Sequence, residues 1–232
     1  MKKRSGLLQF NEEVHEFNTL SLLLSTIATI GMLLIAILYY DAIDEMKVWS
    51  NYSFLMFAFG TIGMLSLNIY KNKKFKFSIR FKRLDPDDIY YALLTFVLLL
   101  IVQIISSLIR VYLAPENIIE ILYTIFSSIC EELFYRGFIL GFFIYLARGY
   151  KKSILIIGLI ISSGLFVSSL AFSLSHTNYY SDPFLLIIVF VSGLILGLAY
   201  IIRKDIIVPM LAHFMLNFYI VLQSGALFNA LA

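Results

Sequence analysis

Long stretches without charged residues constrain this chain more than any other feature of its sequence. A bilayer crossing by a helix needs about 20 predominantly apolar residues, and six uncharged apolar runs approach or exceed this length. In lipid the backbone of such a run must satisfy its own hydrogen bonds, which favours helix. The six runs are Leu20–Tyr40, Val48–Tyr70, Ile89–Ile109, Ser153–Leu174, Phe184–Ile202 and Ile206–Leu222.

A seventh long apolar run, Ile121–Leu146, differs from the others because it carries Glu131, Glu132 and Arg136. The chain is 60% hydrophobic and only 14% charged, so the sequence predicts an all-α fold, a polytopic transmembrane helical bundle. We expect about seven helices, within the range of six to eight that this length allows. No linker or repeat divides the sequence, and residues 1–232 are expected to form a single integral membrane domain.

The positions of Lys and Arg predict the orientation of this bundle. With seven crossings and a cytoplasmic N-terminal segment over residues 1–19, 15 of the 18 Lys and Arg residues fall on the cytoplasmic side. Cytoplasmic loops of membrane proteins carry such an excess of positive charge. Seven of these residues lie in Lys71–Arg83. We interpret that loop as a topology determinant, with attraction to anionic lipid or to an acidic substrate tail as the alternative.

The net charge and the cysteine content bear on binding partners and disulfides. Acidic residues and a glycine spacing predict where helices start and where they meet. The net charge of +3 gives no indication of nucleic acid, and the single cysteine, Cys130, excludes an intramolecular disulfide. Asp85 with the acidic residues after it, and Asp205 before the last run, are typical of helix starts. The small-residue spacing of Gly193 and Gly197 predicts close approach of two helices.

Three ionisable residues inside the run Ile121–Leu146 require partners or a function. At the centre of a membrane each such side chain costs about 2.5–3.5 kcal/mol on insertion scales. Glu132 and Arg136 are four residues apart, so they share a helix face and can form an ion pair. Glu131 is rotated about 100° away from Glu132 and has no local cation. One carboxylate is therefore expected to be structural and the other available as a base; a single network of all three is the alternative.

Two further pairs place polar groups on other predicted helices. Phe172 and His176 lie one turn apart at the end of the fifth helix, and His213 and Asn217 lie one turn apart in the seventh. His15, the third histidine, lies in a polar run and is expected to be solvated. A single histidine in a membrane is often only a hydrogen-bonding group between helices. Two histidines, an asparagine and an unpaired glutamate on three helices instead predict a shared site.

These residues resemble the signature of a known family. The patterns EExxxR at Glu131–Arg136, FxxxH at Phe172–His176 and HxxxN at His213–Asn217 match, in order and helical context, the CAAX-protease and bacteriocin-processing (CPBP, Abi) intramembrane proteases. The resemblance identifies residues 118–222 as a protease-like helical core, after three N-terminal helices within residues 20–113. It implies a membrane-embedded endopeptidase that hydrolyses a peptide bond of a peptide or protein substrate.

The resemblance also implies a role for each motif residue. Glu131 would be the general base that activates a water, and His176 would help to hold that water. His213 and Asn217 would stabilise the oxyanion of the tetrahedral intermediate. The residues expected to support the site structurally are Glu132, Arg136 and Phe172.

No cofactor is expected, although the same side chains leave a metal mechanism open. Glu131, His176 and His213 are of the types that hold zinc with one position open for water. The HExxH motif of many zinc proteases is absent from the sequence, and the resemblance implies metal-free catalysis. Zinc is therefore the alternative mechanism.

The sequence does not identify the substrate. Within the family that the chain resembles, eukaryotic members remove the last three residues of prenylated CAAX proteins. Bacterial relatives are associated with maturation of peptide pheromones or bacteriocins and with self-immunity. The composition, rich in Ile, Lys and Phe, resembles that of proteins from a low-GC bacterium and therefore favours the bacterial role. The alternatives are a non-enzymatic membrane immunity or partner-binding protein on the same scaffold, and a proton-coupled transporter, for which two related halves would be expected.

The predicted site conflicts with a bundle of straight helices. At the helical rise per residue, His176 lies about 35 Å along a helix that starts at Ser153, near the outer surface, whereas His213 lies about 10 Å from the inner end of its helix. A kink at Ser162–Gly164 or Ser168–Ser169 would bring the histidines together, as would first turns that lie along the membrane interface. The sequence leaves both arrangements open.

Overall fold

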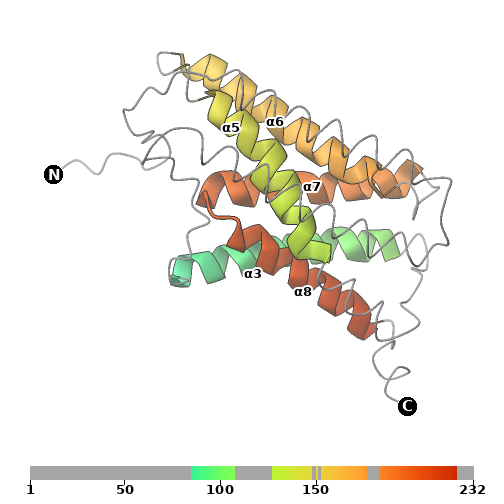
Figure 1. The fold of residues 1–232 in the computed structure, drawn as a ribbon. Coiled ribbons are helices and arrows are strands. Elements are labelled where there is room, and N and C mark those ends of the chain that lie inside the picture. The colour runs from blue at the N-terminus through green and yellow to red at the C-terminus, as the bar shows by residue number, and fades with distance from the viewer. Residues whose placement is uncertain (1–84, 108–126, 148–149, 151–152, 177–182, 224–232) are drawn as a thin grey trace.

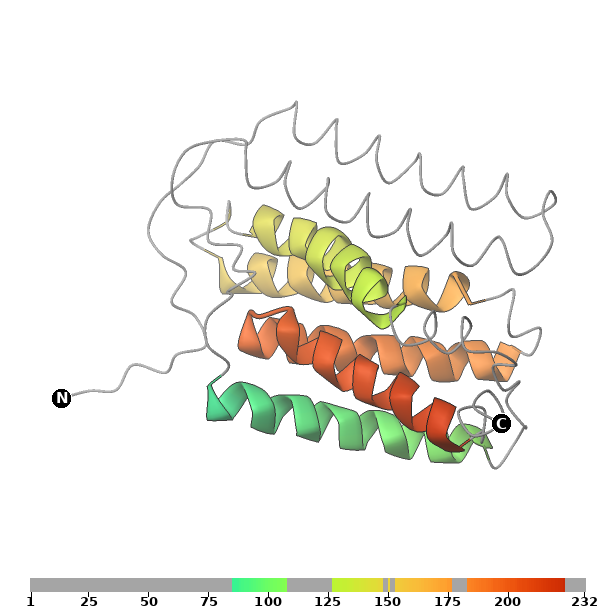
Figure 2. The ribbon, with the colours of Figure 1, turned by 60° about the horizontal axis from the view of Figure 1, so that its bottom comes forward.

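The structure, a computed structural model, describes residues 85–107, 127–147, 150, 153–176 and 183–223 (Figures 1 and 2). Its main elements within these ranges are all helical, and no strand occurs there. The elements are α3 (Pro86–Ser107), the π-helix η1 (Leu133–Leu140), α5 (Gly141–Ala147), α6 (Ile154–Leu174), α7 (Pro183–Arg203) and α8 (Ile207–Gln223). Residues 127–132 are α-helical and run directly into η1. We call the continuous helical stretch 127–147 helix four.

The predicted all-α membrane fold is confirmed for the part of the chain that the structure describes. Three helices, α3, α6 and α7, are long and apolar enough to cross a membrane, and α8 is a shorter apolar helix. The expected helices Leu20–Tyr40 and Val48–Tyr70 and the basic loop Lys71–Arg83 lie outside the described residues. The total of about seven helices, the division into N-terminal helices and core, and the orientation stay predictions.

Acidic residues begin α3 and α8, as the sequence predicted. The backbone N–H of Asp88 donates to Asp85 Oδ1 at 2.9 Å, and Pro86 occupies the first helical position, where no N–H is needed. At the start of α8 the N–H of Ile207 donates to Asp205 Oδ1 at 3.0 Å. Arg203, the last residue of α7, pairs with both Asp85 and Asp88. This contact fixes the start of α3 beside the end of α7.

Close helix contacts build the bundle around α7. α6 lies along α7, and α3 contacts both α7 and α8. Gly193 allows the approach to α6, since a Cβ there would lie 3.1 Å from the Cα of Ser169. A Cβ on Gly197 would lie 2.4 Å from a side-chain atom of Leu165, so both glycines occupy positions where helices meet, as predicted. Helix four forms a buried cluster with α6, α7 and the turn between α7 and α8, which consists of Leu133, Phe134, Tyr135, Phe138, Leu140, Phe172, Tyr200 and Ile206.

Oblique helices, rather than a break in α6, bring the two histidine motifs together. α6 runs as one uninterrupted α-helix through Ser162–Gly164 and Ser168–Ser169, where the sequence allowed a kink. Figures 1 and 2 show helix four and α8 running obliquely across α3, α6 and α7. A helix that crosses its neighbours at an angle contacts them at a different depth from the one expected for a straight, upright helix. His176 at the end of α6 thereby comes close to His213 in the second turn of α8.

Candidate active site

Glu132 and Arg136 form a fully buried ion pair in helix four. Arg136 Nη1 lies 2.9 Å from Glu132 Oε1, and both side chains have no exposed surface. The pair predicted from the four-residue spacing is therefore present. Arg136 has two further partners: Nη2 donates to the carbonyl oxygen of Gly193 on α7 at 3.1 Å, and the guanidinium lies 4.5 Å from the ring centre of Phe172. These contacts connect helix four to both α6 and α7.

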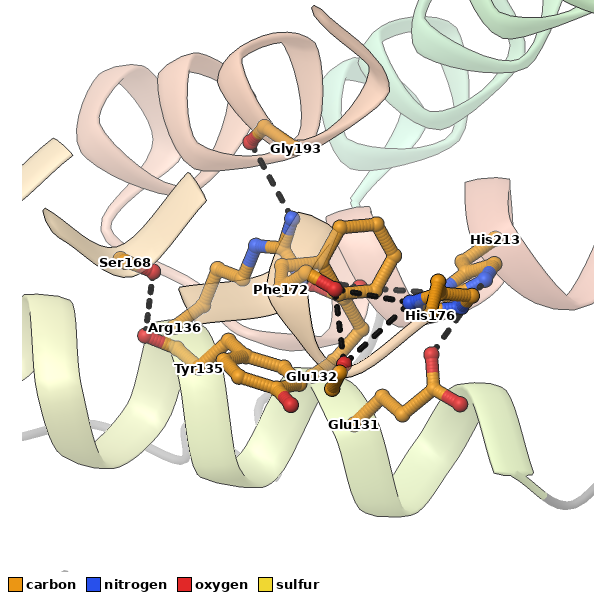
Figure 3. A network of polar contacts seen from close by, with 10 residues as sticks. Glu131, Glu132, Tyr135, Arg136, Ser168, Phe172, His176, Gly193 and His213 are labelled. Atoms are coloured by element: carbon orange, nitrogen blue, oxygen red, sulfur yellow. Dashed lines mark hydrogen bonds and ion pairs between the residues drawn. The ribbon is translucent and has the colours of Figure 1, made fainter. Parts of the chain in front are cut away.

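His213 lies between the two adjacent glutamates. Its Nδ1 is 2.9 Å from Glu132 Oε1, and its Nε2 is 3.9 Å from Glu131 Oε2 (Figure 3). A carboxylate that is paired with a guanidinium acts only as an acceptor, so the hydrogen in the contact with Glu132 belongs to Nδ1 of the histidine. The ring of His213 is thereby held with Nε2 directed at Glu131. Helix four and α8 meet at this contact.

Phe172 is the apolar centre of the site. Its ring centre lies 4.7 Å from that of His176 and 5.8 Å from that of His213, and Arg136 lies over its face. The backbone carbonyl oxygen of Phe172 accepts from His176 Nδ1 at 2.7 Å. Because a carbonyl only accepts, this bond places a hydrogen on Nδ1 and leaves Nε2 of a neutral His176 as an acceptor. Phe172 thus contacts both histidines and the ion pair.

Glu131 differs from its neighbour in the way that the helix geometry predicted. Its side chain retains 14% of its exposure, whereas that of Glu132 has none. No hydrogen-bond donor among the described residues reaches Oε2 of either glutamate, and both of these atoms are buried. A buried carboxylate oxygen without a donor is costly and is a sign of a functional group. Glu132 has Arg136 and His213 on its other oxygen, whereas the partly exposed Glu131 has no cation within hydrogen-bond distance in the described part of the chain and can offer Oε2 to a ligand.

Asn217 lies one helical turn beyond His213 on α8 and is half-buried. The one-turn spacing expected from the sequence is therefore present, and the role of Asn217 stays a prediction. The other predicted residues, Glu131, Glu132, Arg136, Phe172, His176 and His213, converge at one place (Figure 3).

Sequence reasoning missed several residues that hold the site. The carbonyl of Gly193 accepts from Arg136, and the hydroxyl of Ser168 donates to the carbonyl of Tyr135 at 2.7 Å. A signal for Ser168 was available, because it precedes Phe172 by one turn and His176 by two. Nothing in the sequence indicated the π-helix η1 or the choice of the Gly193 carbonyl as a partner.

A zinc site was the alternative for the same side chains. Within the described residues, no three or more His, Cys, Asp and Glu side chains converge in an arrangement that could hold a metal ion. Both histidines use Nδ1 for a protein acceptor and direct Nε2 elsewhere, which is an orientation that metal-bound histidines also show. The orientation of each ring is therefore compatible with either mechanism, and the metal-free mechanism stays a prediction.

Comparison with protein families gives a match over the part of the chain that contains the site residues. The family model described as type II CAAX prenyl endopeptidase Rce1-like matches residues 92–219, a segment that includes all three motifs. Searches among curated proteins and among solved structures found no match. The matched segment exceeds half of the 232 residues. The chain therefore belongs to the Rce1-like family of type II CAAX prenyl endopeptidases, a family of membrane proteases.

Proposed function

We propose that this protein is an intramembrane endopeptidase in which Glu131 activates a water molecule for attack on a peptide bond. The observation that carries the proposal is the unpaired, buried Oε2 of Glu131, 3.9 Å from Nε2 of His213. That separation is too long for a direct hydrogen bond. It is short enough for one water molecule to contact both atoms, since each contact of a water spans about 2.8 Å. The geometry supports a water at this position.

His176 is suited to help hold the same water. Its Nδ1 donates to the Phe172 carbonyl, so Nε2 can accept a hydrogen from water. Removal of one water proton by Glu131 produces a hydroxide whose oxygen forms a bond to the carbonyl carbon of the substrate. Positioning on packed helices and the burial of the site, where the side chains of Glu131 and His213 are 14% and 7% exposed, both favour this step.

The tetrahedral intermediate requires donors for its negatively charged oxygen. When both nitrogens of His213 carry a hydrogen, Nδ1 donates to Glu132 and Nε2 is available to the oxyanion. Asn217 would supply an amide donor from the next turn of α8. Glu131 then returns its proton to the leaving nitrogen as the C–N bond breaks, which restores the carboxylate. Glu132, Arg136 and Phe172 hold this arrangement without contacting the substrate.

We further propose that the substrate is a bacteriocin or pheromone precursor or a prenylated protein of the CAAX type, with maturation or self-immunity as the biological role. The bacterial role rests on composition, and the CAAX role is supported by the family. The proposed location is a bacterial cell membrane, with the N-terminus in the cytoplasm, as the distribution of Lys and Arg indicates. Catalysis is proposed to be metal-free, with zinc held by Glu131, His176 and His213 as the alternative.

The proposal is tested by cleavage of a panel of fluorogenic peptides, prenylated and unprenylated, by the purified full-length protein in detergent. Wild type, Glu131→Gln and His213→Ala are compared, each with and without a strong chelator. Asp87→Asn, an acidic residue with a 79% exposed side chain outside the site, is the control for loss of a carboxylate. We expect cleavage by wild type and Asp87→Asn that survives the chelator and is lost in the two site variants.

The other outcomes separate the alternatives. Loss of cleavage with chelator, and recovery on adding zinc, would show the metal mechanism. Full activity of Glu131→Gln would refute the assignment of the base. If folded wild type cleaves no peptide but protects cells, and Glu131→Gln does not protect them, the result would favour a protease with a narrow range of substrates. Protection that persists in Glu131→Gln would favour the non-enzymatic immunity protein.

A further inference from the structure

The π-helix η1 is the most unusual backbone feature near the site. It begins directly after Glu132 and contains Arg136. π-helical turns are rare, and they occur frequently at functional sites. The wider winding of such a turn changes the direction of the side chains before it relative to those after it. The relative placement of Glu131, Glu132 and Arg136 therefore depends on what holds this turn in its wide form.

One side chain of α6 holds the backbone of η1 directly. The hydroxyl of Ser168 donates to the carbonyl oxygen of Tyr135 at 2.7 Å, and Ser168 is only 1% exposed (Figure 3). A buried carbonyl strongly prefers a donor, and this one receives a donor from outside its own helix. Rewinding of the segment into a regular α-helix would move this carbonyl away from Ser168.

Ser168 belongs to the same stripe of α6 as two residues already placed at the site. Ser168, Phe172 and His176 follow one another at intervals of four residues, which places them on one side of the helix. The first binds the backbone of η1, the second covers the guanidinium of Arg136 at 4.5 Å, and the third contacts the second with ring centres 4.7 Å apart. A displacement of helix four along this stripe would therefore change the distance between Glu131 and both histidines.

We propose that Ser168 is a positioning residue of the site. Its hydroxyl anchors the π-helical turn of helix four so that Glu131 and Glu132 face His213. It contacts neither substrate nor water and acts through the backbone of Tyr135. The expected effect of Ser168 on catalysis rests on the proposed proteolytic function, whereas its expected effect on the position of helix four does not.

The neighbouring residue Ser169 supplies a matched control. It lies on the same helix and is also fully buried, and its hydroxyl has no hydrogen-bond partner among the described residues. Ser168→Ala and Ser169→Ala remove the same atom from the same helix at the same degree of burial. Only the first removes a bond to η1.

Two readouts on the purified full-length variants test the proposal. The first is the steady-state kinetics on a peptide that wild type cleaves. The second is the rate at which N-ethylmaleimide modifies Cys130, which is the only cysteine of the chain, directly precedes Glu131 and is partly buried. For Ser168→Ala we expect kcat to fall by about 10- to 100-fold, the scale of a small misplacement of catalytic groups, with little change in KM. We also expect Cys130 to react several-fold faster because helix four is less restrained. Ser169→Ala should match wild type in both measurements.

The other outcomes either contradict the proposed role of Ser168 or test that role without relying on the proposed proteolytic function. Equal kinetics and equal Cys130 reactivity in the two serine variants would overturn the proposal, as would the same loss in both, which would indicate general packing. If wild type cleaves no peptide, the proposed function fails while the reactivity of Cys130 still tests the anchor. If Ser168→Ala does not fold, Ser168→Thr keeps the hydroxyl, and its failure to retain wild-type Cys130 reactivity would refute the role of that group.

Discussion

Removal of the arginine from the buried ion pair should destabilise the protein more than removal of both charges. Arg136→Met replaces the guanidinium by an apolar chain and leaves the carboxylate of Glu132 without its cation at a position with no exposed surface. Breaking a buried pair by removing one partner costs about 3–5 kcal/mol, because an uncompensated charge stays buried. The lost bond to the Gly193 carbonyl and the lost contact with Phe172 are part of this change.

The double variant Glu132→Gln/Arg136→Met removes both charges and should recover much of this loss. The amide of glutamine still offers an oxygen to His213 Nδ1, which lies 2.9 Å from the carboxylate of Glu132. Replacing a buried ion pair by neutral groups is often close to neutral in stability. We therefore expect a coupling energy of about 2–3 kcal/mol between the two positions, near the upper end of measured values for contacting residues.

The measurement is reversible unfolding in mixed micelles of a mild detergent with increasing dodecyl sulfate, followed by far-ultraviolet circular dichroism. Wild type, both single variants and the double variant form one double-mutant cycle. A double variant as unstable as Arg136→Met would refute the reasoning, since charge compensation would then not be what Arg136 supplies. Proteolytic activity is expected to stay low in the double variant even where stability returns, because the charged partner of His213 is absent.

Three further predictions concern the helix contacts that surround the site. Gly193→Ala should lower the free energy of unfolding by about 1–3 kcal/mol, because its Cβ would lie 3.1 Å from the backbone of α6. A Cβ on Gly158 would have no neighbouring atom within 4 Å, so the stability of Gly158→Ala should stay within about 1 kcal/mol of wild type. Thermal unfolding compares the two variants. Asp205→Ala should lower the free energy of unfolding by about 0.5–2 kcal/mol through loss of the N-cap of α8, whereas Asp205→Asn should keep most of the stability that the cap provides. Equal melting temperatures for the two variants would contradict the cap. Arg203→Gln should lower the melting temperature by leaving the carboxylate of Asp88, only 6% exposed, without its cation, while kcat of the folded enzyme stays unchanged; a lower kcat at equal stability would contradict a purely structural role.

The local features of the fold could be predicted because their causes are local. The apolar runs that became α3, α6, α7 and α8 are long, and lipid allows them no other backbone state. Asp85 and Asp205 precede apolar helices, and both cap them in the structure. The ion pair of Glu132 and Arg136 follows from a spacing of four residues within one helix.

The composition of the site was also present in the sequence, but its geometry was not. The three motifs named the residues that converge, and the Rce1-like family match covers all three. That His213 would bind Glu132 through one nitrogen and face Glu131 with the other depends on how α8 crosses helix four. Straight, upright helices would have kept His176 and His213 at different depths. The oblique paths of helix four and α8 bring them together while α6 remains unbroken.

The sequence by itself determined a membrane-embedded helical protein, the starts of its helices and the chemical groups of its site, because each of these follows from residues close together along the chain. Only the tertiary structure decided that helix four winds as a π-helix beside Ser168, that the carbonyl of Gly193 binds Arg136, and that Glu131 keeps an unpaired oxygen. The bonds of Ser168 and Arg136 join different helices through backbone carbonyl groups, which every residue carries. No side-chain pattern marks them, and they exist only once the helices are packed against one another.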